Sequence, residues 1–338
     1  MIAANRPLLA APVIRTRCED LEELWFVIVA SSRNPRSFLS WHRIQMSTSL
    51  RQAILKSLRR LGVRSFTARS GLGYPFLCHV GDFSGEVPFY NRGHSCAEIQ
   101  LMAEWCRRHP HSVVFDVGAN VGFVATQLAQ AGKSANCSIL AFEPVYDTFV
   151  KLMASIQKLG LQNEVIPVFC AVSDRSGGLC TVAFDKSKSL FAQVQQNKVN
   201  ARVGSTLTWC SEVTLDLVVE SIGCSPGLLK IDVEGYEAHV LRGARALLQS
   251  RNAPVICFEL NPGTLGEVGS SVASVAAELR GYRVYYLDDF EGQKIPLGKE
   301  IPDMASLTWC CNLFAAPRSV AESQARVLFQ SLASPDVL

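Results

Sequence analysis

The stretch from Val113 to Phe123, with the sequence VVFDVGANVGF, constrains the fold of this 338-residue chain more than any other. An apolar, β-branched run contains Asp116, a turn with Gly118 and Gly122 follows, and a helix-like pattern begins at Phe123. This order is typical of a strand, a tight turn and a helix N-terminus, which open a nucleotide-binding α/β unit. The two glycines would let the backbone approach a ligand closely, and the free N–H groups of the helix would face the same place.

The spacing of the glycines narrows the choice of ligand. Dinucleotide-binding turns follow the pattern GxGxxG, whereas here Asn120 replaces the middle glycine and Asp116 precedes the turn. A carboxylate at this position would repel a pyrophosphate, but it suits a ligand that carries an ammonium group. S-adenosylmethionine is such a ligand, and we expect its amino-acid end to pair with Asp116 directly or through water. A βα turn that binds no ligand is the alternative that this motif alone leaves open.

Length and composition predict one large globular domain with an N-terminal extension. Apolar residues make up 48% of the chain and charged residues 19%, so a sizeable core is expected. The net charge of +3 is too small to predict a nucleic-acid partner. Between Leu24 and Gly81 there are nine Lys or Arg and no Asp or Glu. We therefore divide the chain into a basic extension (residues 1–70), a catalytic domain (71–317) and a C-terminal tail (318–338).

The sequence predicts a cytoplasmic location. No apolar run approaches the roughly 20 residues that a membrane-spanning helix needs. The twelve cysteines include no CxxC pair, which favours a reducing compartment and argues against a zinc site. Residues 46–70 begin with Met46, are rich in Arg and Ser and contain no acid, so they would be typical of an organelle-targeting peptide if translation started there. The alternatives are a disordered segment or a basic helix packed on the domain.

Alternating strand and helix patterns predict a doubly wound parallel sheet. A hairpin is expected over residues 75–90, and a helix that roofs the site is expected to follow a capping box of Ser95 and Glu98 and to end near residue 110. The core (111–317) begins after it. Residues 184–208 are polar and irregular, and they predict an insertion over the carboxyl edge of the sheet. The expected strands lie at 112–117, 139–142, 165–172, 228–232, 254–260, 282–287 and 307–315.

Acidic residues end most of these strands, and ligands bind at the carboxyl ends of strands in such sheets. Glu143 follows the second strand, where it could accept hydrogen bonds from both ribose hydroxyls of either NAD or S-adenosylmethionine. Asp174 follows the third strand and is predicted to accept a hydrogen bond from an adenine amino group. Asp232 and Glu259 end the fourth and fifth strands. These side chains are therefore expected to meet at one edge of the sheet.

Two segments, Asp116–Gly122 and Lys230–Glu237 (KIDVEGYE), resemble the FkbM family of S-adenosylmethionine-dependent methyltransferases over about residues 85–315. The resemblance implies the class I methyltransferase Rossmann-like sheet, with seven strands of which the last is antiparallel. It implies methyl transfer, typically to oxygen, with a sugar, a glycoconjugate or another small metabolite as the acceptor. By motif, the residues at the cofactor are Asp116, Gly118, Asn120, Gly122 and Glu143, and those at the donor–acceptor junction are Asp232 and Glu234.

The candidate catalytic residues are Asp232, Glu234 and Glu259. Asp232 or Glu234 would accept the hydroxyl proton as a general base. Alternatively, Asp232 and Glu259 would hold a divalent cation that acidifies the hydroxyl; we favour the metal-free version. Two other hypotheses about the function remain at this point. The protein could be an NAD-dependent oxidoreductase on a similar sheet, or a non-catalytic relative that binds S-adenosylmethionine.

Overall fold

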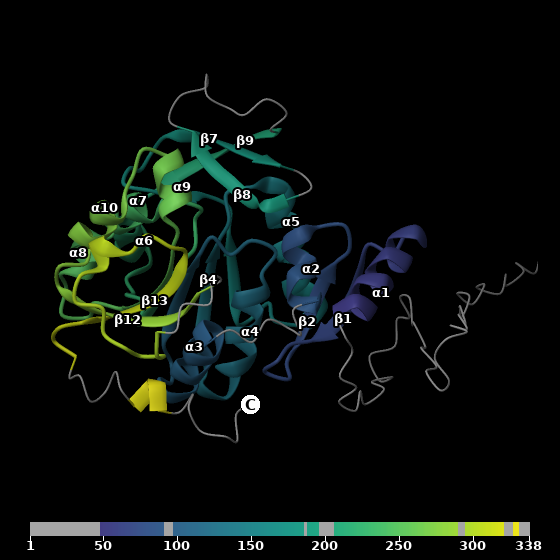
Figure 1. The fold of residues 1–338 in the computed structure, drawn as a ribbon, viewed down its shortest axis with the longest axis horizontal. Helices are drawn as coiled ribbons and strands as arrows, with labels where there is room; N and C mark the ends of the chain where they lie inside the picture. The colour runs from purple at the N-terminus through teal and green to yellow at the C-terminus, as the bar shows by residue number, and fades with distance from the viewer. Residues whose placement is uncertain are drawn as a thin grey trace, which may run out of the picture.

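The computed structural model describes residues 48–90, 97–185, 188–195, 206–289, 295–320 and 327–330 (Figure 1). Residues 1–47, Ser95 of the expected capping box and the middle of the 184–208 insertion lie outside the described residues. Within these ranges, no helix has both the length and the apolar character that crossing a membrane requires.

A seven-stranded sheet forms the centre of the domain, with the order β12-β13-β11-β10-β3-β4-β5. Strand β13 is antiparallel to both of its neighbours, and the other adjacent pairs are parallel. This order confirms the expected class I methyltransferase sheet. The strands are β3 (Val113–Val117), β4 (Ser138–Phe142), β5 (Val165–Val168), β10 (Leu228–Ile231), β11 (Val255–Leu260), β12 (Tyr282–Asp289) and β13 (Cys311–Pro317).

Helices cover both faces of this sheet, because its central strands are apolar on both sides. In β3, for example, Val114 packs on one face and Phe115 on the other, and both are fully buried. One face carries α3 (Ala97–Arg108), α4 (Phe123–Ala131) and α5 (Tyr146–Leu159). The other carries α6 (Leu215–Ile222), α7 (Glu237–Arg242), α8 (Arg245–Leu248) and α10 (Val272–Glu278), while α9 (Pro262–Glu267) follows β11.

The hairpin predicted over residues 75–90 is wrong. Only β2 (Pro75–His79) is a strand; it pairs with β1 (Ser65–Arg69), and Phe83–Tyr90 forms helix α2. Gly85 lies in this helix, where a Cβ would come within 2.8 Å of the Cβ of His79, so this close approach requires a glycine. The Asp82 carboxylate accepts a hydrogen bond from the Gly85 N–H and caps the helix.

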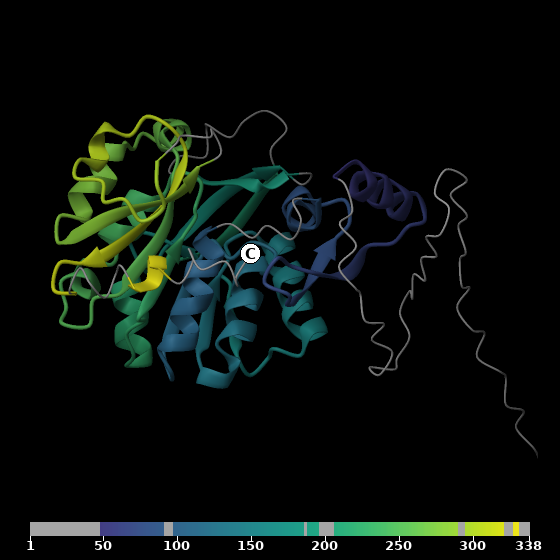
Figure 2. The ribbon, with the colours of Figure 1, turned by 60° about the horizontal axis from the view of Figure 1, so that its bottom comes forward.

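The start of the described chain packs on the domain at one end of the sheet (Figure 2). Helix α1 (Thr48–Arg60) buries Leu55 against Phe76 and Phe89. The β1–β2 hairpin has one strand on each side of residue 70, the expected boundary between the extension and the domain. This arrangement agrees with the basic helix packed on the domain. Removal of residues 46–70 as a targeting peptide would take away α1 and leave β2 without its partner strand.

The third predicted strand, residues 165–172, is divided between two sheets. Strand β5 ends at Val168, and β6 (Ala171–Val172) pairs instead with β9 (Thr206–Val213). Together with β7 (Leu179–Asp185) and β8 (Lys188–Gln195), they form a second sheet, which lies at the top of Figure 1. The last strand of the main sheet begins at Cys311 instead of residue 307, because Asp303 caps a short 3-10 helix over Met304–Ser306.

Candidate functional site

A cleft opens at the carboxyl ends of the central strands of the main sheet. Its walls come from the turn between β3 and α4, the end of β4, the turn between β10 and α7, and strands β11 and β13, with α2 and α3 beside them. Among its lining residues are five acids and one base: Glu98, Glu143, Asp232, Glu234, Glu259 and Lys230. The structure therefore brings together most of the acids that the sequence placed at strand ends.

The turn after β3 requires a left-handed backbone at three positions. Gly118 has a φ of 83°, Asn120 of 51° and Gly122 of 85°. A Cβ on Gly118 would lie 1.8 Å from the backbone oxygen of Asp232, and one on Gly122 would lie 2.5 Å from Cδ1 of Leu152. Asn is among the few residues that tolerate this conformation without being glycine. The pattern GxNxG thus brings the turn directly against the end of β10.

Asp116 lies in β3 directly before Val117 and Gly118, which line the cleft, and it is fully buried. Neither carboxylate oxygen has a hydrogen bond of normal geometry to a described residue, and the Lys230 ammonium lies 3.8 Å from Oδ1. Burial raises the pKa of Asp116, while Lys230 opposes this shift. Buried carboxylates normally have hydrogen-bond donors, so this one fits a ligand that supplies a cationic N–H group.

Lys230 lies between the carboxylates of Asp116 and Asp232. Its Nζ lies 3.1 Å from Oδ2 of Asp232, and register places it beside Asp116 in the neighbouring strand. Burial lowers the pKa of Lys230, but Asp232 and Asp116 outweigh burial, so the pKa is raised and the ammonium stays charged. This fixed cation therefore lies between the two carboxylates.

Glu143 is fixed by the turns on both sides of it. Its Oε2 accepts a hydrogen bond from the Asn120 N–H at 2.9 Å, and its Oε1 accepts one from the Val145 N–H at 2.9 Å. Burial raises the pKa of Glu143 to about 7, although these two backbone bonds oppose the shift. A carboxylate has about four lone-pair sites, so hydroxyl groups of a ligand can still bind to it.

The turn after β10 brings Asp232 and Glu234 to the cleft beside Glu259. The Asp232 side chain is 37% exposed. Burial, followed by the Asp232 charge, raises the pKa of Glu234 to about 9 and that of Glu259 to about 8. Glu237 caps the turn before α7, since its Oε1 accepts hydrogen bonds from the N–H groups of Val233 and Gly235.

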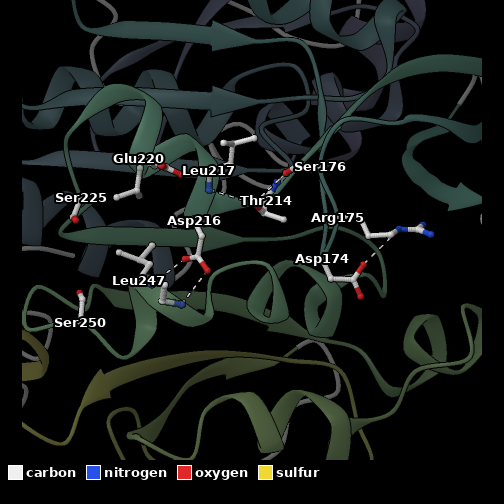
Figure 3. Close-up of a pocket in the computed structure, with 12 residues that line it drawn as sticks. Asp174, Arg175, Ser176, Thr214, Asp216, Leu217, Glu220, Ser225, Leu247 and Ser250 are labelled. Atoms are coloured by element: carbon white, nitrogen blue, oxygen red, sulfur yellow. Dashed lines mark hydrogen bonds and ion pairs between the residues drawn. The ribbon is translucent and has the colours of Figure 1, made fainter.

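The structure does not group Asp174 with the other acids. Its Oδ2 accepts a hydrogen bond from Arg242 at 2.8 Å and lies 2.9 Å from Nδ1 of His239. Because the chain leaves the main sheet after Val168, residue 174 follows β6 and lines a different hollow (Figure 3). That hollow, about 620 Å³, lacks the other strand-end acids.

The Methyltransferase FkbM domain is the family whose sequence model matches this chain, over residues 116–284. That match runs from the Asp116 carboxylate through both motifs of the cleft. The chain belongs to the FkbM methyltransferase family.

Relatives of this FkbM-family chain include Hexuronic acid methyltransferase AglP of Haloferax volcanii (strain DS2), which is 32% identical over 159 residues. The match covers 47% of this chain and 59% of AglP, so the chain spans about three fifths of that relative's length. Methyltransferase FkbM from Methylobacillus flagellatus KT matches with 14% identity and a TM-score of 0.38, over 61% of this chain and 43% of that one. A putative O-methyltransferase from Klebsiella pneumoniae matches with 15% identity and a TM-score of 0.38, over 65% and 79%.

Three residues of this FkbM-family cleft were missed as site residues in the sequence: Glu98, Lys230 and Asn312. Lys230 is a cation inside an apolar strand, and Asn312 is an amide inside an apolar strand. Buried polar residues in such runs are rare unless they have a partner, and this was the available signal. Among the described residues, no group of three or more His, Cys, Asp or Glu side chains could hold a metal ion.

The raised carboxyl pKa values predict how stability depends on pH. Burial raises the pKa of Glu98 and of Glu143 to about 7 and that of Glu259 to about 8. A carboxyl whose folded pKa exceeds its unfolded value of about 4.3 stabilises the fold below that value, and this stabilisation is lost as pH rises through the folded pKa. We expect the cofactor-free protein to be less stable at about pH 8.5 than at about pH 6.5. The free energy of unfolding should fall by up to roughly 1.4 kcal/mol per pH unit for each proton that the folded state binds and the unfolded state does not.

Thermal unfolding at several pH values measures this dependence. The variant Glu259→Gln should show a shallower decline, because one of the titrating groups is removed. Equal unfolding temperatures of the wild-type protein across this range would contradict the expected titration.

Proposed function

We propose that the chain is an S-adenosylmethionine-dependent methyltransferase that transfers the methyl group to a hydroxyl of a sugar, a glycoconjugate or another small metabolite. The observation that carries the proposal is the buried Asp116 carboxylate next to the Gly118 turn, whose oxygens have no hydrogen bond of normal geometry to a described residue. The name of the relative AglP supports a carbohydrate acceptor.

The residues of the cleft fit this cofactor. Asp116 would pair with its ammonium group and Glu143 with its ribose hydroxyls. Phe142, Ala171 and Val172 also line the cleft and would give the adenine ring apolar walls. The cleft volume of about 190 Å³ lies below the roughly 300–1,000 Å³ of most ligand pockets, so we expect the cleft to widen when the cofactor binds.

The chain's residues supply alignment and proton transfer. Bound S-adenosylmethionine supplies an electrophilic methyl group on a sulfonium centre. Asp232 accepts the proton that the acceptor hydroxyl loses, and Lys230 holds its carboxylate in place. Glu234 and Glu259, with pKa values raised to about 9 and about 8, hold protons near pH 7 and can donate hydrogen bonds to acceptor oxygens. We favour this version over a divalent cation at Asp232 and Glu259, because Lys230 already supplies a positive charge beside Asp232.

Transfer of a labelled methyl group tests the proposal. The full chain is incubated with S-adenosylmethionine labelled in its methyl group and with methyl glycosides and uronides as acceptors. We expect label in at least one acceptor. Tight binding of S-adenosylmethionine without transfer to any acceptor would favour the non-catalytic relative, and reduction of NAD by an alcohol would favour the oxidoreductase.

A further inference from the structure

A β-bulge in β12 turns Asp288 towards helix α3. Tyr282, Val284 and Tyr286 pack on the α7 and α10 face of the sheet, and regular alternation would place residue 288 on that face too. The register shifts between Tyr286 and Asp288, so that Asp288 pairs with Asn312. Asn312 shares a face with Phe314, which packs with α3. Bulges near active sites often redirect a side chain in this way.

The Asp288 carboxylate connects the sheet to the roof helix. Its Oδ1 accepts a hydrogen bond from the Asn312 side-chain amide at 2.6 Å, and its Oδ2 accepts one from the Ala97 N–H at 3.1 Å. Ala97 is the first residue of α3, where backbone N–H groups lack partners within the helix and a negative charge is favourable. Asp288 thus holds the N-terminus of α3 against β13.

Asp288 is connected to two residues of the cleft, directly to Asn312 and through Ala97 to Glu98. Glu98 follows Ala97 directly and is 7% exposed, and Asn312 is 5% exposed; both line the cleft. In register, Asn312 lies opposite Glu259 of β11. Burial, followed by the nearby charges of Lys230, Asp232 and Asp288, shifts the pKa of Glu98 to about 7.

Strand order separates these groups from the expected cofactor side. Strands β3 and β4, which carry Asp116 and Glu143, lie on one side of β10, and β11 and β13 lie on the other. An acceptor that meets the methyl group at Asp232 must therefore occupy the β11 and β13 side. Carboxyl and amide groups both form hydrogen bonds with hydroxyl groups, which donate one bond and accept two.

We propose that Glu98, Glu259 and Asn312 form an acceptor subsite that binds the hydroxyl groups of a polyhydroxyl acceptor, and that Asp288 is the positioning residue that orients Glu98 and Asn312. This inference rests on the proposed function. It adds three residues to the site, and it explains the bulge in β12.

The test compares Asp288→Ala with the wild-type chain, using labelled S-adenosylmethionine and a set of methyl glycosides with gluco, galacto and manno configurations. We expect the wild-type chain to methylate at least one glycoside. Asp288→Ala should lower kcat/KM for that glycoside about 10-fold or more, mainly through a higher KM, because displaced Glu98 and Asn312 would bind its hydroxyl groups less well and a misplacement of about 1 Å can cost 100-fold in rate. Its affinity for S-adenosylmethionine, measured by calorimetry, should stay close to that of wild type. Asp288→Asn keeps one acceptor oxygen and should restore part of the loss.

Asp216→Ala is the matched control. The Asp216 carboxylate also accepts two hydrogen bonds at a helix N-terminus, from the N–H groups of Ala246 and Leu247, but it lies in the hollow of Figure 3. This variant should leave KM unchanged, so any general loss of stability is separated from the subsite.

Two results would overturn the inference. These are an unchanged KM in Asp288→Ala and an equal rise in Asp216→Ala. Absence of S-adenosylmethionine binding to the wild-type chain, or binding without methyl transfer to any acceptor, would instead overturn the proposed function, and the subsite with it.

Discussion

Substitution of Gly118 by alanine is expected to destabilise the domain by roughly 2–5 kcal/mol and to abolish binding of S-adenosylmethionine. The new Cβ would lie 1.8 Å from the backbone oxygen of Asp232, and the residue would have to keep a φ of 83°. Neither the turn nor the end of β10 can move without displacing the cleft. Chemical denaturation and calorimetry measure the two effects.

Gly160→Ala provides the control for this substitution. Gly160 ends α5 with a φ of 69°, but a Cβ there would have no atom within 4 Å. The expected cost is therefore only that of the left-handed backbone, about 1–2 kcal/mol, with cofactor binding retained. If both variants lose the same stability and both bind the cofactor, close contact at Gly118 has no functional role.

Asp232→Asn is expected to lower kcat by about 100- to 10,000-fold, which is the usual contribution of a general base. The amide has nearly the same shape and can still accept the hydrogen bond from Lys230, but it cannot take a proton from the acceptor hydroxyl. Binding of S-adenosylmethionine should change little. Steady-state kinetics with labelled methyl donor, together with calorimetry, separate these effects.

Asp174→Asn is the control for the loss of a carboxylate. Asp174 also accepts a hydrogen bond from a cationic side chain, that of Arg242, but it lies outside the cleft. Turnover and cofactor affinity should therefore stay near wild type. Normal turnover by Asp232→Asn would remove Asp232 as the proton acceptor, and weaker cofactor binding by Asp174→Asn would restore the adenine contact predicted from the sequence.

Local sequence patterns predicted most of the main sheet, because its strands are short apolar runs that end in acids or turns. The pattern could not show where the third strand leaves the sheet, since β6 pairs with β9, which lies far away in the sequence. The wrong hairpin over residues 75–90 has a different cause. Gly85 is required by its close approach to His79 at the end of the preceding strand, and not by a turn.

The sequence predicted those residues of the cleft whose positions depend only on where a strand ends. Asp232 and Glu259 meet because β10 and β11 are adjacent parallel strands. Asp174 was placed with them on the assumption that the third strand continued to Val172. The positions of Glu98 and Asn312 depend on how α3 crosses the sheet and on the bulge before Asp288, and neither follows from local periodicity.

Calorimetric titration with S-adenosylmethionine tests the central claim most directly, with NAD as the control ligand. The wild-type chain should bind S-adenosylmethionine with a dissociation constant in the micromolar range and should not bind NAD. Asp116→Asn should weaken binding by about 10- to 150-fold, because a hydrogen bond to a charged group contributes about 1.5–3 kcal/mol. Absence of binding by the wild-type chain, or equal binding by Asp116→Asn, would contradict the assignment of this cleft to the cofactor.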